Sequence, residues 1–78
     1  MKIKIAAYGI LRSYLGQNSG APIEKEMKQP KTISEIISEI GIPDGMVMLI
    51  AANDEQKNFD YIPKDGDEIK LIPPISGG

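Results

Sequence analysis

The sequence predicts a small domain of the α+β class, in which a sheet is packed by one main helix plus a short helix. Two segments near the ends of the chain alternate between apolar and other residues, and a segment between them has apolar residues at helical spacing. The 78 residues are 41% hydrophobic and carry a net charge of −2, as expected of one mildly acidic globular domain. A chain of this length has no room for a second domain.

The two alternating segments, residues 2–8 and 68–72, are each expected to form a strand with one buried face. Side chains two residues apart lie on the same face of a strand, so each segment divides into an inner and an outer row. The inner rows are expected to hold Ile3, Ile5, Ala7, Ile69 and Leu71, and the outer rows Lys2, Lys4, Ala6, Tyr8, Lys70 and Ile72. Two large apolar residues, Tyr8 and Ile72, are therefore expected on the outer face.

The clearest helix signal begins at Thr32, which forms with Glu35 the T-x-x-E pattern of a capping box. Four isoleucines share the spacing i, i+3, i+4 and i+7, namely Ile33, Ile36, Ile37 and Ile40. Gly41 is placed to end this helix, and its apolar stripe must lie on the sheet because so short a chain offers no other cover. A shorter helix is expected over residues 9–15, ended by Gly16.

The segments between these elements give weaker signals. Phe59 and Tyr61 are expected to dock a loop or short strand onto the core. The remaining expected elements are a weak strand over residues 22–27, an apolar strand over 47–53, and polar turns over 53–56 and 64–67.

Cysteine and histidine are both absent. Their absence excludes a disulfide framework, Ser-His or Cys-His catalysis and the usual ligand sets for zinc. The carboxylates of Asp65, Asp67 and Glu68 could be considered as a cation site, but acidic residues in a turn are far more often solvated, so no metal or cofactor is predicted. Scattered lysines argue against nucleic-acid binding, and no apolar run reaches membrane-helix length, so a soluble, cytoplasmic protein is expected.

Residues 73–78, Pro-Pro-Ile-Ser-Gly-Gly, are expected to form an extended tail that follows a domain of residues 1–72. The prolines favour an extended backbone, and Gly77 and Gly78 fit a channel too narrow for residues with side chains. A frayed terminus is the alternative, because chain ends are commonly disordered. A terminal carboxylate that is activated as a mixed anhydride with AMP can be attacked by a sulfide, a thiol or an amine. This chemistry needs neither histidine nor cysteine in the chain that carries the carboxylate.

The order of elements, the chain length and the residues from Asp65 to Gly78 resemble the MoaD/ThiS family of ubiquitin-like sulfur carriers. The Asp-Gly-Asp-Glu turn at residues 65–68 and the two prolines before Gly-Gly are most similar to the MoaD type, the small subunit of molybdopterin synthase. Residues 8–12, Tyr-Gly-Ile-Leu-Arg, are similar to the family's first junction between strand and helix.

This resemblance implies a β-grasp fold with a mixed sheet of four to five strands, in which the first and last strands are parallel neighbours. It also implies that an E1-like adenylating enzyme of the MoeB/ThiF type activates Gly78, and that sulfur is then installed there as a thiocarboxylate. The synthase large subunit, of the MoaE type, would receive the tail in a heterotetramer and use the sulfur for molybdenum cofactor biosynthesis. The chain would be no enzyme on its own and would need no cofactor. The residues implied to meet partners are Tyr8, Arg12, Ile72, Pro73, Pro74, Ile75 and Ser76, and those implied to reach the reaction centre are Gly77 and Gly78.

Three other functions share these sequence features. A sulfur carrier for another acceptor, such as thiazole or thiolated tRNA, would use the same activated carboxylate. A ubiquitin-like modifier would pass it to lysine amines instead. A passive interaction module with an incidental Gly-Gly end would not use it at all. The sequence does not distinguish a molybdopterin carrier from a carrier for another acceptor or from a modifier, because the partner protein determines which acceptor attacks the activated carboxylate.

Overall fold

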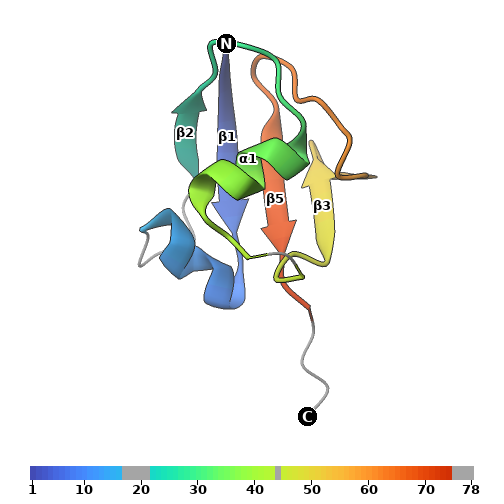
Figure 1. The fold of residues 1–78 in the computed structure, drawn as a ribbon. Helices are drawn as coiled ribbons and strands as arrows, with labels where there is room; N and C mark the ends of the chain where they lie inside the picture. Colours follow the sequence, from blue (N-terminus) through green and yellow to red (C-terminus); the bar gives the residue numbers. More distant parts are fainter. Residues whose placement is uncertain (17–21, 44, 75–78) are drawn as a thin grey trace.

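The computed structural model describes residues 1–16, 22–43 and 45–74. Within them, a five-stranded sheet is covered on one face by the helix α1 (Figure 1). The elements in chain order are β1 (Lys2–Ala7), the 3₁₀ helix η1 (Gly9–Leu15), β2 (Ile23–Glu26), α1 (Ile33–Ile40), β3 (Leu49–Ala52), β4 (Glu55–Lys57) and β5 (Glu68–Ile72). No helix in these described segments is long and apolar enough to cross a membrane.

The strand order is β2-β1-β5-β3-β4, with β1 and β5 parallel and every other pair antiparallel. The expected mixed sheet with parallel first and last strands is therefore confirmed. The register of the parallel pair sets Ile5 beside Ile69 and Ala7 beside Leu71. These inner residues are buried, as the alternation predicted.

Helix α1 begins and ends as its sequence predicts. The Thr32 hydroxyl accepts a hydrogen bond from the Glu35 amide at 3.2 Å, and the Glu35 carboxylate accepts one from the Thr32 amide at 3.0 Å. Gly41 ends the helix at φ 93°, a left-handed conformation that glycine adopts without strain. The first three isoleucines are buried against the sheet, and Ile40 is partly buried at its margin.

Two expectations for the sheet were wrong. Residues 55 and 56 belong to strand β4 and not to a turn, because Asn53 and Asp54 alone reverse the chain, at φ 53° and 69°. Ala6 lies in the outer row, yet it is only 5% exposed. Its small side chain sits in a central strand, paired in register with the much longer Lys70. Other strand ends differ from the predicted bounds by up to two residues.

Asp67 is buried, in contrast to the solvated turn residue that was expected. Its side chain is 6% exposed and accepts hydrogen bonds from Asn53 Nδ2 at 2.8 Å, the Tyr61 hydroxyl at 2.5 Å and the Lys64 amide at 2.9 Å. Burial alone would raise the pKa of Asp67, but these hydrogen bonds outweigh it and hold the pKa below its ordinary value. The bond to Asp67, together with burial, raises the pKa of Tyr61 to about 12. We call Asp67, Asn53 and Tyr61 the Asp67 cluster.

Candidate functional site

The chain leaves the sheet at the end of β5, next to the start of η1 (Figure 1). Two backbone hydrogen bonds fix this point. The Tyr8 amide donates to the Leu71 carbonyl at 3.2 Å, and the Met48 amide donates to the Ile72 carbonyl at 2.8 Å. The last described residues, Pro73 and Pro74, follow directly, so the position from which any tail starts is held from both sides.

The outer face of the sheet changes from charged to apolar toward this end. The outer row of β1 runs Lys2, Lys4, Ala6, and continues to Tyr8, while that of β5 runs Glu68, Lys70, Ile72. Because the two strands are parallel, their apolar ends coincide. Tyr8 is 40% exposed and Ile72 is partly buried beside it. The structure thus brings together Tyr8 and Ile72, the two large apolar residues that the sequence predicted on the outer face.

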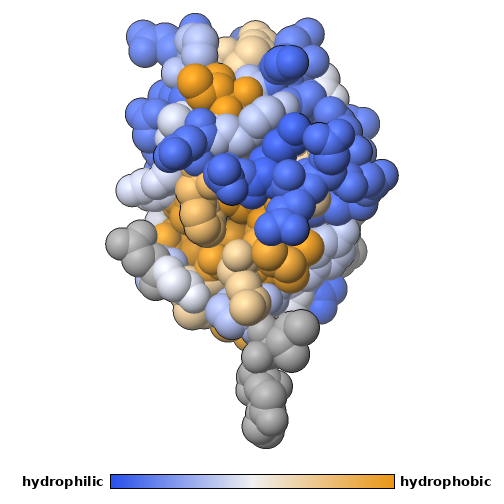
Figure 2. Space-filling view, turned by 90° about the vertical axis from the view of Figure 1, so that its right-hand side faces the viewer, coloured by the Kyte–Doolittle hydropathy of each residue, from blue (hydrophilic) through white to orange (hydrophobic). Residues whose placement is uncertain are grey.

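Two further exposed residues at this end were missed by the sequence analysis. Leu49, opposite Ile72 in the antiparallel register, is 39% exposed, and the adjacent Met48 is 58% exposed. Figure 2, which views the molecule from the β3 side, shows an apolar area directly above the point where the chain leaves the body. We call Tyr8, Met48, Leu49 and Ile72 the tail-root patch. Residues 47–52 are all apolar, so the sequence does not predict which of their side chains are exposed.

The other residues expected to meet partners divide into two groups. Arg12 lies exposed on η1, and among the described residues it forms no ion pair. Pro73 is partly buried and Pro74 is exposed. Ile75, Ser76, Gly77 and Gly78 lie outside the described residues.

The charged groups toward the other end of the sheet form ion pairs and hydrogen bonds, and the described residues among them form no metal site. Lys70 Nζ lies 2.7 Å from Asp54 Oδ1, and this contact lowers the pKa of Asp54. Two of the three turn carboxylates serve the fold: Asp67 is enclosed in its cluster, and Asp65 accepts a hydrogen bond from the Lys2 amide at 2.8 Å. In the part of the chain that the structure describes, no group of three or more acidic residues is arranged to hold a metal ion.

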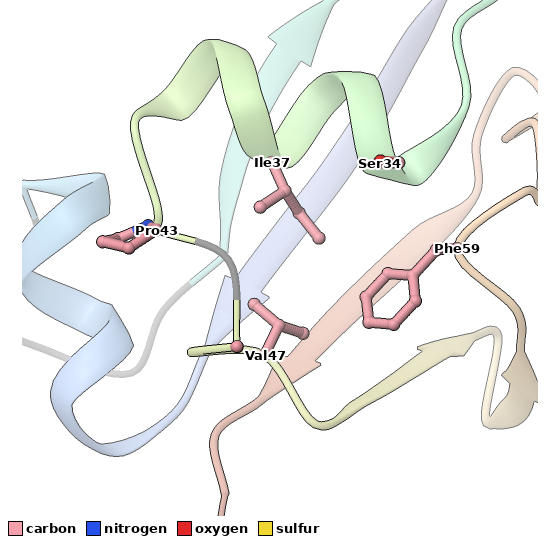
Figure 3. A pocket seen from close by; sticks show the side chains of 6 residues that line it. Ser34, Ile37, Pro43, Val47 and Phe59 are labelled. Carbon is pink, nitrogen blue, oxygen red and sulfur yellow. The ribbon is translucent and has the colours of Figure 1, made fainter.

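A cavity of about 270 Å³ lies on the other side of the sheet, between α1 and the segments that precede β3 and follow β4. Ile37, Val47 and Phe59 point toward one another across it (Figure 3). Phe59 is 42% exposed, so it covers the margin of the core and is not fully docked into it. The cavity opens on the helix side, whereas Tyr8 and Ile72 face outward from the sheet, so it is separate from the tail-root patch.

Comparisons with known proteins bear on the family and the fold of this chain. The sequence matches the model of the ThiS family over residues 9–78. A Pyrococcus furiosus protein assigned as molybdopterin converting factor, subunit 1, is similar in structure, with a TM-score of 0.69 and 22% identity over 96% of this chain and 99% of that chain. SAMP1 from Haloferax volcanii gives a TM-score of 0.68 and 16% identity, with all of both chains covered.

A third similar structure is the complex of subunits 1 and 2 of molybdopterin-converting factor from Helicobacter pylori. Its matching chain gives a TM-score of 0.60 and 24% identity, and 100% of each chain is covered. No curated protein matches the sequence closely enough to count as a relative. At these identities the structural likenesses establish the fold, which is the ubiquitin-like β-grasp.

Proposed function

We propose that this chain, which belongs to the ThiS family of sulfur carriers, is the sulfur-carrying small subunit of a molybdopterin synthase. The observation that carries the proposal is the tail-root patch, which lies at the point where a segment ending in Gly77–Gly78 leaves the sheet. An exposed apolar surface at that point gives a partner a place to hold the body while the tail enters its active site. Two of the similar solved structures carry the name of a molybdopterin converting factor subunit.

The proposed chemistry takes place on the Gly78 carboxylate. In an E1-like adenylating enzyme, a carboxylate oxygen attacks the α-phosphate of ATP, which forms an acyl adenylate and releases pyrophosphate. A sulfide equivalent then displaces AMP and leaves a thiocarboxylate. In the synthase large subunit the thiocarboxylate sulfur displaces a leaving group from a carbon of the pterin precursor, which forms a thioester between the two. Water then cleaves the bond between this sulfur and the carbonyl carbon of Gly78, so that the sulfur stays on the pterin and the carboxylate is restored. ATP and the catalytic groups belong to the partners, which suits a chain without histidine or cysteine.

Mass spectrometry of the intact chain tests this proposal. After coexpression with its activating enzyme and a sulfur donor, we expect the mass change of one oxygen replaced by one sulfur, localised by fragmentation to Gly78. The same chain expressed without the activating enzyme is the control. A sulfur on any side chain, or an unmodified chain under both conditions, would contradict the proposal.

Conjugation to lysine is the second candidate function, because a further solved structure with the same fold is named small archaeal modifier protein 1 of Haloferax volcanii. Both functions begin with the same adenylate, and they differ in whether sulfide or an amine attacks it. Isopeptide-linked Gly78 on lysines of other proteins would indicate a modifier. A thiocarboxylate that is consumed when the synthase large subunit and pterin precursor are added would indicate the molybdopterin carrier.

Charge introduced into the tail-root patch is expected to weaken partner binding. In Tyr8→Asp or Met48→Asp, docking would bury an unpaired carboxylate, so we expect the Kd for the large subunit to rise by about tenfold or more. Both parent side chains are substantially exposed, so the fold should survive. Isothermal titration measures the affinity, and circular dichroism monitors folding.

Ile62→Asp provides the matched control for these two variants. Ile62 is an apolar residue of similar exposure, at 48%, but it lies in the loop that leads into the opposite end of β5. We expect it to bind the large subunit as tightly as the parent. If all three variants bind equally, the partner docks elsewhere on the molecule.

A further inference from the structure

Gly9 lies in close contact with the first residue of the proposed tail. A Cβ atom built on Gly9 would come 3.2 Å from Pro73 Cγ, which is tighter than side chains ordinarily tolerate. Gly9 also has φ 59°, in the left-handed region where other residues are strained. The ring of Pro73 therefore rests against the start of η1 at a place where a side chain on residue 9 would push it away by a few tenths of an ångström.

This contact adds to the two hydrogen bonds that flank the end of β5. The ring fixes φ of Pro73, and with no amide hydrogen Pro73 cannot extend the ladder of the sheet. Contact with Gly9 on one side and the Met48–Ile72 hydrogen bond on the other then fix where the chain passes as it leaves the body. We propose that Gly9 is a positioning residue, whose missing side chain lets Pro73 seat against η1 and so sets the direction in which the tail departs.

The consequence for reaction rate rests on the proposed function. A docked body carries Gly78 to the partner's active site only if the tail starts in the right direction. Displacement of reacting atoms by about 1 Å can cost up to about a hundredfold in rate, and a Cβ on Gly9 would shift Pro73 by a few tenths of that distance. For Gly9→Ala we therefore expect kcat for adenylation to fall about threefold to tenfold. KM should be unchanged, because the tail-root patch is intact.

Gly16→Ala is a control matched for backbone strain. Gly16 ends the same helix at φ 68°, but a Cβ there would meet nothing within 4 Å. Both alanine variants strain the backbone, so both should lose some thermal stability, while only Gly9→Ala should lower kcat. Pro73→Ala supplies the second test: it removes the ring against which the added methyl group would press, so adding Gly9→Ala to Pro73→Ala should lower kcat no further.

Tail direction can also be measured without any sulfur chemistry. The chain has no cysteine, so Ser76→Cys provides a unique position for a nitroxide label. The pattern of paramagnetic relaxation of body amides should change in Gly9→Ala and stay as in the parent in Gly16→Ala. Equal patterns in all three chains, or equal changes in both variants, would overturn the role of Gly9. If the patterns behave as expected while the parent gains no sulfur, the proposed function fails and the positioning role stands.

Discussion

Deletion of Gly77 and Gly78 is expected to abolish sulfur loading and to leave the body folded. The deletion removes the carboxylate that would be adenylated, and a chain shortened by two residues would not present another at the same place. The buried core extends only from Ile3 to Leu71, so the thermal midpoint should be unchanged. Affinity for the large subunit should be largely retained because the tail-root patch remains. Mass spectrometry, thermal unfolding and titration measure the three quantities.

A chain extended by one alanine after Gly78 is the matched control. It keeps both glycines and the whole body but moves the carboxylate onto a residue with a side chain. If loading requires a glycine carboxylate at this position, the extended chain should fold and bind but remain unloaded. Loading of the deleted chain would show that the sulfur acceptor lies elsewhere, and a large fall in its thermal midpoint would show that the glycines belong to the fold.

The parts of the fold that the sequence predicted are those with a local signal of their own. Helix α1 has a capping box, a periodic stripe and a terminal glycine, and the structure has all three. Strands β1 and β5 alternate between charged and apolar residues over Lys2–Ile5 and Glu68–Leu71, so their buried faces could be assigned without knowledge of the neighbouring strands. Strand β4 lacks such a signal. Its three residues, Glu-Gln-Lys, pair with β3 through the backbone at the sheet edge, and nothing in their side chains requires it.

The candidate site could be predicted only where it follows from alternation within one strand. Tyr8 and Ile72 are outer-row residues, and the parallel pairing implied by the family resemblance was enough to place them together. Met48 and Leu49 lie beside Tyr8 and Ile72 because β3 is the other neighbour of β5. The sequence around them is uniformly apolar, so it does not predict which strand β3 pairs with. The role of Gly9 depends on a contact with a residue more than sixty positions away, which no local pattern encodes.

Asp67 was misjudged for a related reason. A turn sequence of Lys-Asp-Gly-Asp indicates solvated carboxylates, but the partners that bury Asp67 come from two other segments, around Asn53 and Tyr61. The Asn53 side chain also accepts a hydrogen bond from the Glu68 amide at 3.0 Å, so the Asp67 cluster joins the β3–β4 turn to the start of β5. This cluster stabilises the end of the sheet opposite the tail-root patch.

Asp67→Ala is expected to lower the free energy of unfolding by about 3–5 kcal/mol, because it removes the buried carboxylate that accepts three part-buried hydrogen bonds. Asp65→Ala changes an exposed carboxylate in the same turn that accepts one backbone hydrogen bond, and it should cost much less. Urea unfolding at neutral pH measures both values. Equal losses in the two variants would show that burial of Asp67 adds nothing to stability.

The pH dependence of stability should separate the members of the Asp67 cluster. Because the pKa of Asp67 is held below its ordinary value of 3.8, its contribution is complete above that value and is lost as the pH falls through the folded-state pKa. The pKa of Tyr61 is raised from 10.0 to about 12, so its contribution is complete below pH 10 and is lost as the pH rises toward 12. The stability difference between the parent and Asp67→Ala should therefore shrink in acid, and that between the parent and Tyr61→Phe should shrink in alkali. Differences that stay constant across both ranges would mean that neither group changes its pKa on folding, and the hydrogen bond between them would then not form in solution.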